Sequence, residues 1–144
     1  MIADFSIEQL IEQYAPHIKK TLAADRQFVK AEFTHDGSHI VTVGYDASIR
    51  LWSTDLDEPQ QIAINESHQG WVTGLAVHTA EARVFTSDSF GTLSCFEYAN
   101  SMLQPVWSNT DAHGGWVRDL ALAPDGRTLV SASRDQTIST WDPN

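Results

Sequence analysis

The chain has 144 residues, of which 42% are hydrophobic and 19% are charged, and this composition predicts one compact globular domain and argues against disorder. Its formal net charge is −10 and it has nine lysine and arginine residues, so a nucleic-acid partner is not expected, because phosphate contacts need clustered basic side chains. Cys95 is the only cysteine, which excludes an internal disulfide and fits a reducing compartment.

Residues 1–16 carry two competing patterns. Ser6 and Gln9 form a capping box, and the apolar side chains that follow share one helical face until a proline ends the run, which predicts a short amphipathic helix. Alternatively, Asp4–Ile7 repeats the pattern of Asp46–Ile49 and would then be a degenerate third strand of an earlier repeat. The start of the chain lacks a signal-peptide pattern and no apolar run reaches membrane-spanning length, so we expect a cytoplasmic protein without a membrane contact.

From residue 17 onward, a repeat organises the chain. Trp52 and Phe96 are 44 positions apart, and Phe96 and Trp141 are 45 apart, a period typical of one four-stranded propeller blade. We expect three such repeats, at about 17–53, 60–98 and 103–142. Short β-branched and aromatic runs alternate with polar residues and turn pairs in each of them. The third repeat predicts strands at Val117–Ala123, Thr128–Ser133 and Thr137–Trp141, and a fourth strand per repeat is predicted at His17–Leu22, Gln61–Ile64 and Val106–Ser108.

The third repeat contains His113, then Pro124-Asp125-Gly126, then Asp135, and closes on Trp141-Asp142. These pieces, with weaker copies upstream, resemble the WD-repeat family, and the resemblance covers roughly residues 17–142. It implies an all-β fold with three four-stranded antiparallel blades, which is an incomplete β-propeller, beside the short N-terminal helix. It also implies a scaffold that binds proteins and is not an enzyme.

In that family, a His, a Ser or Thr, a turn Asp and a strand Trp are linked by side-chain hydrogen bonds within each blade. The second repeat departs from this pattern with Phe90 and Phe96 at the Asp and Trp positions, which we interpret as an apolar substitute for the network. The first repeat has Ala24 at the His position. A Ser, a His and an Asp also spell a catalytic triad, but their recurrence with the blade period favours a structural role. The matching residues are His113, Ser131, Asp135 and Trp141 in the third repeat, Thr42, Asp46 and Trp52 in the first, and His68 and Thr86 in the second.

No other pattern indicates catalysis or a metal site. His17, His35, His39 and His78 lie at unrelated places in the repeats and lack the spacing of metal ligands, so we interpret them as surface histidines. Cys95 occupies an interior strand position and is expected to pack rather than react. We expect no cofactor, no metal and no catalytic residue.

The resemblance also implies a binding face, formed by residues at the start of each first strand and by the residue before each turn Asp. Trp, Tyr and Arg dominate the energetics of protein interfaces, so we expect this face to bind a protein or peptide partner. Alternatively, Trp71 and Trp116 pack against neighbouring blades. Carried over by position, the face consists of Trp116, Arg118 and Arg134 in the third repeat, Trp71, Thr73 and Ser89 in the second, and Gln27, Val29 and Tyr45 in the first.

Three blades do not close a ring, because propellers use about 4–8 blades. The chain begins with an expected fourth strand and ends after an expected third strand, so one hypothesis is a homodimer in which two chains complete a six-bladed ring. Another is that the chain is a fragment, or a regulatory or targeting module, of a longer WD-repeat protein or enzyme. A metal-dependent propeller hydrolase is a further alternative, although the first strands offer only Glu32 and Asp119 as scattered acidic residues.

Overall fold

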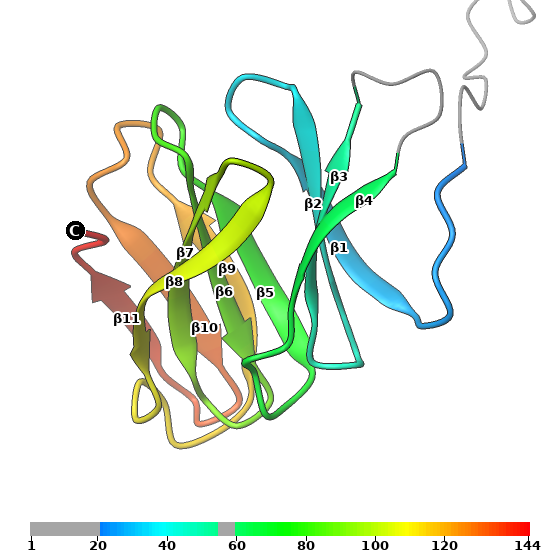
Figure 1. Cartoon of the computed structure of the whole chain (residues 1–144). Helices are drawn as coiled ribbons and strands as arrows, with labels where there is room; N and C mark the ends of the chain where they lie inside the picture. The colour runs from blue at the N-terminus through cyan, green and yellow to red at the C-terminus, as the bar shows by residue number, and fades with distance from the viewer. Residues whose placement is uncertain (1–20, 55–59) are drawn as a thin grey trace, which may run out of the picture.

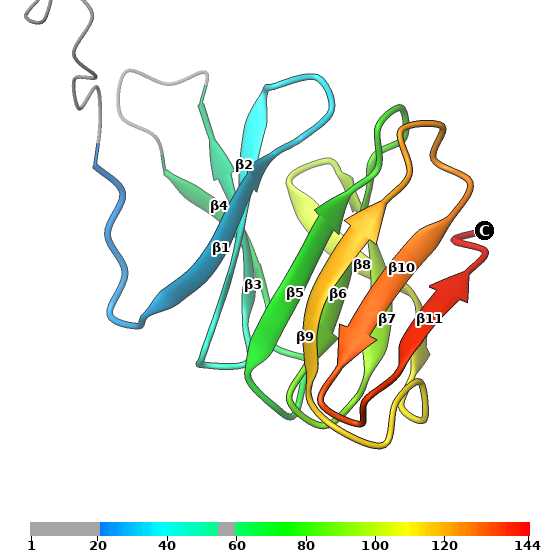
Figure 2. The same ribbon diagram turned by 180° about the vertical axis from the view of Figure 1, so that it is seen from behind.

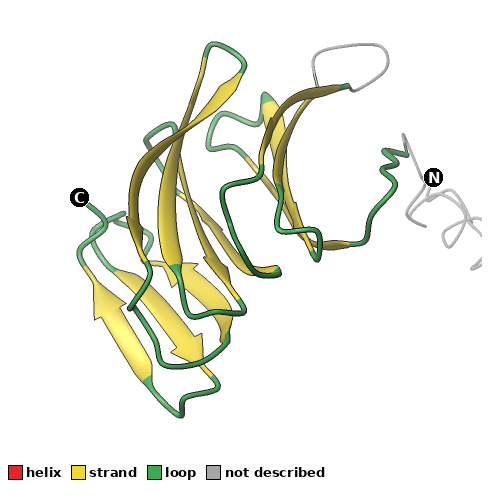
Figure 3. Ribbon diagram, turned by 60° about the horizontal axis from the view of Figure 1, so that its bottom comes forward, coloured by secondary structure: helices red, strands yellow, loops and turns green. Residues whose placement is uncertain are grey.

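The computed structural model describes residues 21–54 and 60–144, and every regular element in these ranges is a β-strand (Figure 1). The view coloured by secondary structure shows strands and loops without a helix (Figure 3), which confirms the all-β prediction. No segment within the described ranges is a helix that could span a membrane. The predicted helix over residues 1–16 lies outside the described residues.

The strands follow one another as antiparallel meanders in three sheets, in which neighbours in sequence are also neighbours in the sheet. Sheet 1 contains β1 (Phe28–Phe33), β2 (His39–Gly44), β3 (Ile49–Ser53) and β4 (Gln61–Asn65). Sheet 2 contains β5 (Val72–Val77), β6 (Arg83–Asp88), β7 (Leu93–Ala99) and β8 (Met102–Asn109). Sheet 3 contains β9 (Val117–Leu122), β10 (Leu129–Ser133) and β11 (Ile138–Trp141).

The sheets are offset by one strand from the sequence repeats. Gln61–Ile64, predicted to open the second repeat, forms most of β4 and pairs with β3 of sheet 1. Sheet 3 has three strands in the described part of the chain, whereas four were predicted for every blade. The remaining predicted strand, His17–Leu22, falls largely outside the described residues, and Thr21 and Leu22 are not in a strand.

Two apolar clusters fill the spaces between neighbouring sheets. Val84 and Phe85 are adjacent in sequence and both fully buried, but they belong to different clusters because successive side chains of a strand point to opposite faces. Sheet 2 is therefore buried on both faces. The cluster between sheets 1 and 2 includes Val41, Val43, Ile49, Leu51, Leu75 and Phe96, and that between sheets 2 and 3 includes Leu93, Cys95, Val117, Leu120 and Leu129.

The first strands of the three sheets, β1, β5 and β9, lie side by side, as Figure 2 shows. Polar side chains join them across the sheets. Lys30 on β1 forms an ion pair with Asp119 on β9, and the Val77 N–H donates to Glu32 Oε2 at 3.2 Å. This convergence of first strands is the arrangement of consecutive propeller blades around an axis, and it engages both acidic side chains of these strands in internal contacts.

The turns between the second and third strands share one backbone feature. Ala47, Gly91 and Gln136 occupy equivalent places in the three sheets and have φ values of 62°, 89° and 73°. At Gly91 the chain also approaches its neighbour closely, because an added Cβ would lie 2.1 Å from the carbonyl oxygen of His113. The turn of sheet 2 therefore fits tightly against the segment that leads into sheet 3.

Candidate functional site

Sheet 3 contains a continuous chain of side-chain hydrogen bonds. His113 Nδ1 lies 2.9 Å from Asp135 Oδ2, and His113 Nε2 lies 2.6 Å from Ser131 Oγ. The indole N–H of Trp141 donates to Ser131 Oγ at 2.8 Å. A carboxylate can only accept, so Nδ1 carries a proton and donates to Asp135. In the neutral imidazole Nε2 then accepts from the Ser131 hydroxyl, whose oxygen also accepts from the indole N–H. The four residues lock the strands of sheet 3 to the loop that precedes it.

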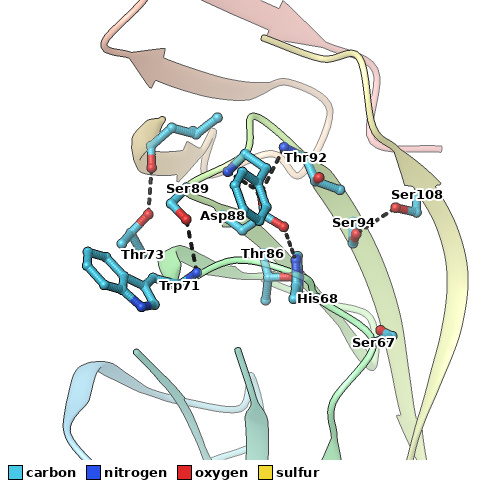
Figure 4. A network of polar contacts seen from close by, with 12 residues as sticks. Ser67, His68, Trp71, Thr73, Thr86, Asp88, Ser89, Thr92, Ser94 and Ser108 are labelled. Atoms are coloured by element: carbon cyan, nitrogen blue, oxygen red, sulfur yellow. Dashed lines mark hydrogen bonds and ion pairs between the residues drawn. The ribbon is translucent and has the colours of Figure 1, made fainter. Parts of the chain in front are cut away.

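Sheet 2 builds a similar chain with its carboxylate from a different position. His68 lies between Asp88 Oδ2 and Thr86 Oγ1, at 2.8 Å from each, as Figure 4 shows. Asp88 is the last residue of β6, and its Oδ1 also accepts from the backbone N–H groups of Phe90 and Thr92. The interpretation of Phe90 and Phe96 as an apolar substitute is therefore wrong, since Asp88 completes the polar network.

Phe90 itself occupies the turn position that the repeat spacing assigned to it, and its side chain faces solvent. The residue is 66% exposed, and the hydrogen bond that a turn aspartate would supply comes from Asp88 instead. Phe96 is buried at the position of the strand tryptophans, and its side chain has no N–H to donate. Thr86 therefore serves His68 alone, whereas Ser131 serves two partners.

Sheet 1 lacks the histidine, and Arg50 on β3 takes its place as the partner of the turn carboxylate. Arg50 Nη2 lies 2.6 Å from Asp46 Oδ2, and Nη1 donates to Ser48 Oγ. Arg50 is buried, so this ion pair is shielded from water. Trp52 Nε1 donates to Thr42 Oγ1 at 2.8 Å, as in sheet 3.

The carboxylates of these networks are held in the ionised form. Burial of Asp46 opposes ionisation, but hydrogen bonds from Arg50 and Ser48 outweigh it and lower its pKa to about 2. The pKa of Asp88 is also lowered, because hydrogen bonds from His68 and two backbone N–H groups overcome its burial. A hydrogen bond from Thr137 leads the interactions that lower the pKa of Asp135.

Three aromatic side chains, one from each sheet, form a continuous row at one end of the molecule. The rings of Tyr45 and Trp71 have centroids 5.2 Å apart, and those of Trp71 and Trp116 are 5.6 Å apart with an edge-to-face geometry. Tyr45 is 44% exposed and Trp71 is 50% exposed. We call Tyr45, Trp71 and Trp116 the aromatic ladder. Its rings both contact the neighbouring sheet and face solvent, so the two interpretations of the tryptophans are compatible.

Two arginine side chains lie close to the Trp116 ring, the last ring of the ladder. The guanidinium carbons of Arg118 and Arg134 lie 4.7 Å and 5.6 Å from the centroid of Trp116. Thr73 holds this ring in place, because its hydroxyl accepts from Trp116 Nε1 at 3.0 Å and donates to the Val117 carbonyl at 2.6 Å. These bonds hold the indole in one orientation, with both guanidinium groups close to its ring.

The other residues assigned to this face lie beside the ladder. The Ser89 N–H donates to the Trp71 carbonyl at 2.9 Å, and Ser89 Oγ accepts from the Trp71 N–H at 3.0 Å. Gln27 accepts from the Tyr45 N–H through its carbonyl and is exposed, while Val29 is half-buried on β1. The residues chosen by repeat position thus gather at one end of the three sheets.

The remaining histidines and the cysteine have structural surroundings. His35 is exposed, but the interpretation of His78 as a surface residue is wrong, because His78 is buried and its Nδ1 accepts from the N–H groups of Ala80 and Glu81. Cys95 is buried in the core, and burial raises the pKa of its thiol to about 11. Among residues 21–54 and 60–144, no group of three His, Cys, Asp or Glu side chains could hold a metal ion.

Comparison with known proteins agrees with this geometry. The family model described as "WD domain, G-beta repeat" matches residues 19–53 and 104–142, which together make up about half of the chain. The chain is 28% identical over 109 residues to apoptotic protease-activating factor 1 of Homo sapiens, covering 72% of this chain and 9% of that protein. It is 24% identical over 113 residues to a guanine nucleotide-binding protein subunit beta-like protein of Encephalitozoon cuniculi, covering 77% of this chain and 33% of that protein.

A third relative is nuclear distribution protein nudF 2 of Penicillium rubens, which is 26% identical over 121 residues, covering 74% of this chain and 26% of that protein. The chain thus spans at most about a third of the length of these relatives. Domains of this kind generally serve as non-catalytic scaffolds for protein interactions. On its matched segments, its three consecutive sheets and its hydrogen-bonded networks, the chain belongs to the WD-repeat family.

Proposed function

We propose that this chain is a non-catalytic scaffold that binds a protein or peptide partner through the aromatic ladder and the residues beside it. The observation that carries this proposal is the continuity of the ladder. Three aromatic rings from three sheets touch in sequence, and two of them leave close to half of their surface in solvent. A row of large, held rings offers apolar area to a partner at a small cost in side-chain entropy.

The first-strand carboxylates support a scaffold over a metal-dependent hydrolase. Glu32 accepts a backbone N–H from the neighbouring sheet, and Asp119 is paired with Lys30. Both acidic side chains of the first strands are thus engaged in holding the sheets together, and the Lys30 ammonium interacts with both of them, which disfavours a second cation there.

The test is a comparison of partner capture by the full chain and two variants. Trp71→Ala removes the central ring of the ladder, and Phe33→Ala removes a ring of similar exposure, 64%, at the opposite end of sheet 1. We expect Trp71→Ala to lose the partners that wild type captures and Phe33→Ala to keep them, with both variants folded by circular dichroism. Equal capture by all three proteins would refute the proposed face.

We further propose that sheet 3 pairs with an additional strand along β11. In the described part of the chain β11 is hydrogen-bonded on one side only, and Ile138 on this strand is 74% exposed. An unpaired edge with an apolar side chain favours strand addition. A second copy of the chain would supply that strand in a six-bladed homodimer, so light scattering should give twice the 16.0 kDa of one chain. A folded monomer across the micromolar range would refute this arrangement.

A further inference from the structure

We propose that the ladder face binds an acidic peptide segment, with a carboxylate held between Arg118 and Arg134 and an apolar side chain of the same peptide resting on Trp71. This inference rests on the proposed function and names the chemistry of its partner. The two cations are the reason, because both guanidinium groups lie close to one indole ring and neither forms an ion pair with a described residue, on a chain whose net charge is −10.

Four lysine and arginine side chains of the described residues pair with a carboxylate of the chain: Arg26 with Asp25, Lys30 with Asp119, Arg50 with Asp46, and Arg83 with Glu81. Arg127, at the opposite end of sheet 3, forms no such pair among the described residues. Arg118 and Arg134 form no ion pair with any described residue, and both are exposed. Their guanidinium groups therefore keep their N–H donors available for an external anion.

The nearby acidic side chains are already committed to the networks within the sheets. Asp135 accepts from His113, Thr137 and the Gly114 N–H, although it directly follows Arg134 in sequence. Asp88 accepts from His68 in the same way. The networks thus hold the carboxylates at this end of the molecule in internal bonds and leave the two guanidinium groups without a counter-ion.

The geometry fits a carboxylate beside an apolar side chain. The guanidinium carbons of Arg118 and Arg134 lie 4.7 Å and 5.6 Å from the centroid of Trp116, and that indole is held by Thr73, so both cations have the same fixed ring as neighbour. Guanidinium groups bind carboxylates with paired, directional hydrogen bonds. Trp71 continues the same surface with half of its area exposed, which provides the adjoining apolar contact. One carboxylate needs only these two cations, whereas a nucleic-acid backbone needs clustered basic side chains, and the whole chain has nine lysine and arginine residues.

The test is a selection from a random dodecapeptide library displayed on phage, with the full chain as bait. We expect the selected peptides to be enriched in Asp and Glu next to Trp, Phe, Leu or Tyr. One selected peptide is then synthesised and labelled, together with a copy in which every Asp and Glu is replaced by Asn and Gln. The copy should bind at least about tenfold more weakly, a difference of about 1.4 kcal/mol.

Three charge reversals locate the site. Arg118→Glu and Arg134→Glu should each weaken binding of the labelled peptide by about tenfold, because each places a like charge beside the bound carboxylate. Arg127→Glu makes the same change in net charge at the exposed turn between β9 and β10, at the opposite end of sheet 3, and should leave the affinity within about twofold. Polyuridylate RNA should not displace the peptide.

The outcomes separate this inference from the proposed function. Selected peptides that lose binding on Trp71→Ala but show no excess of Asp and Glu would overturn the acidic-peptide inference and keep the ladder as a binding face. Peptides that bind Trp71→Ala as well as wild type would overturn both. Equal losses of affinity from Arg127→Glu and Arg134→Glu would show that only the overall charge matters, and this would overturn the acidic-peptide inference. Displacement of the peptide by RNA would favour a nucleic-acid ligand and would overturn the same inference.

Discussion

Removing the hydroxyl at the centre of each network should destabilise the three sheets unequally. Ser131 Oγ contacts both His113 Nε2 and Trp141 Nε1, whereas Thr86 Oγ1 contacts only His68 Nε2 among the described side chains. Ser131→Ala therefore leaves two polar groups without a partner, and Thr86→Val leaves one. Each buried polar group that loses its partner costs about 1–3 kcal/mol.

On this basis, we expect Ser131→Ala to lower the free energy of unfolding by about 2–6 kcal/mol and Thr86→Val by about half as much, about 1–3 kcal/mol. Thr42→Val in sheet 1 leaves only the indole N–H of Trp52 unpaired, so its effect should match that of Thr86→Val. Valine keeps the shape of threonine, and alanine removes only the oxygen of serine, so packing changes little.

Urea unfolding followed by tryptophan fluorescence and far-ultraviolet circular dichroism measures these differences. Ser139→Ala is the matched control, because Ser139 lies directly opposite Ser131 and its hydroxyl forms no hydrogen bond with any described residue. The control should change stability by less than about 0.5 kcal/mol. Equal losses from Ser131→Ala and Thr86→Val, or a larger loss from the latter, would refute the reasoning from the number of partners.

Three further changes test other parts of the structure. Gly91→Ala should cost about 2–5 kcal/mol in unfolding free energy, since its new Cβ would lie 2.1 Å from the His113 carbonyl oxygen, while Gly37→Ala, with a similar φ and open space, should cost about 1 kcal/mol. Asp46 should stabilise the fold at pH values above its ordinary pKa of 3.8 and lose that contribution as the pH falls towards about 2, so Asp46→Asn should flatten acid unfolding curves in this range. The Cys95 thiol should react with Ellman's reagent only after urea unfolding, because it is buried and its pKa is raised to about 11.

Each of these expectations has a contrary result. Equal costs for the two glycine substitutions would show that the close approach to His113 is relieved by a backbone shift. Parallel acid unfolding curves for wild type and Asp46→Asn would contradict the ionised, paired state of that carboxylate. Reaction of Cys95 in the folded chain at the unfolded rate would contradict its burial.

The period and the strands could be predicted from the sequence because they depend on local patterns. β4 and β8 were expected from short apolar runs one period apart, and the structure places them as the fourth strands of sheets 1 and 2. The strands of sheet 3 agree with prediction to within one residue at each end. Alternation of apolar and polar residues determines which face is buried, and so it determines strand position as well.

The partners within the networks could not be predicted from repeat position alone. Asp88 lies two residues before the turn position, and a comparison by spacing places Phe90 there instead. A signal was present, because Asp88 is the only acidic residue between Thr86 and Phe96. Arg50 on β3 replaces a histidine that in the other two sheets comes from the loop before the first strand, and this depends on the reach of the Arg50 side chain across the turn. The signal in that case was a charged residue inside an apolar strand.

The aromatic ladder shows the same limit. Repeat position selected Tyr45, Trp71 and Trp116 as members of one face, but their contact depends on how closely the three sheets approach each other. That distance is determined by the apolar clusters between the sheets, whose side chains come from many strands. Sequence spacing can assign residues to an end of a blade, whereas ring-to-ring contact follows only from tertiary packing.

The shifted carboxylate of sheet 2 has a consequence for variation in this chain. In sheets 1 and 3 the turn aspartates are tied to the fold, so substitution of Asp46 or Asp135 removes bonds that hold a loop in place. In sheet 2 Asp88 forms these hydrogen bonds, so the side chain of residue 90 is not needed to hold the turn. We therefore expect that Phe90, at the tip of this turn, can be exchanged for residues of other size and polarity with little loss of stability.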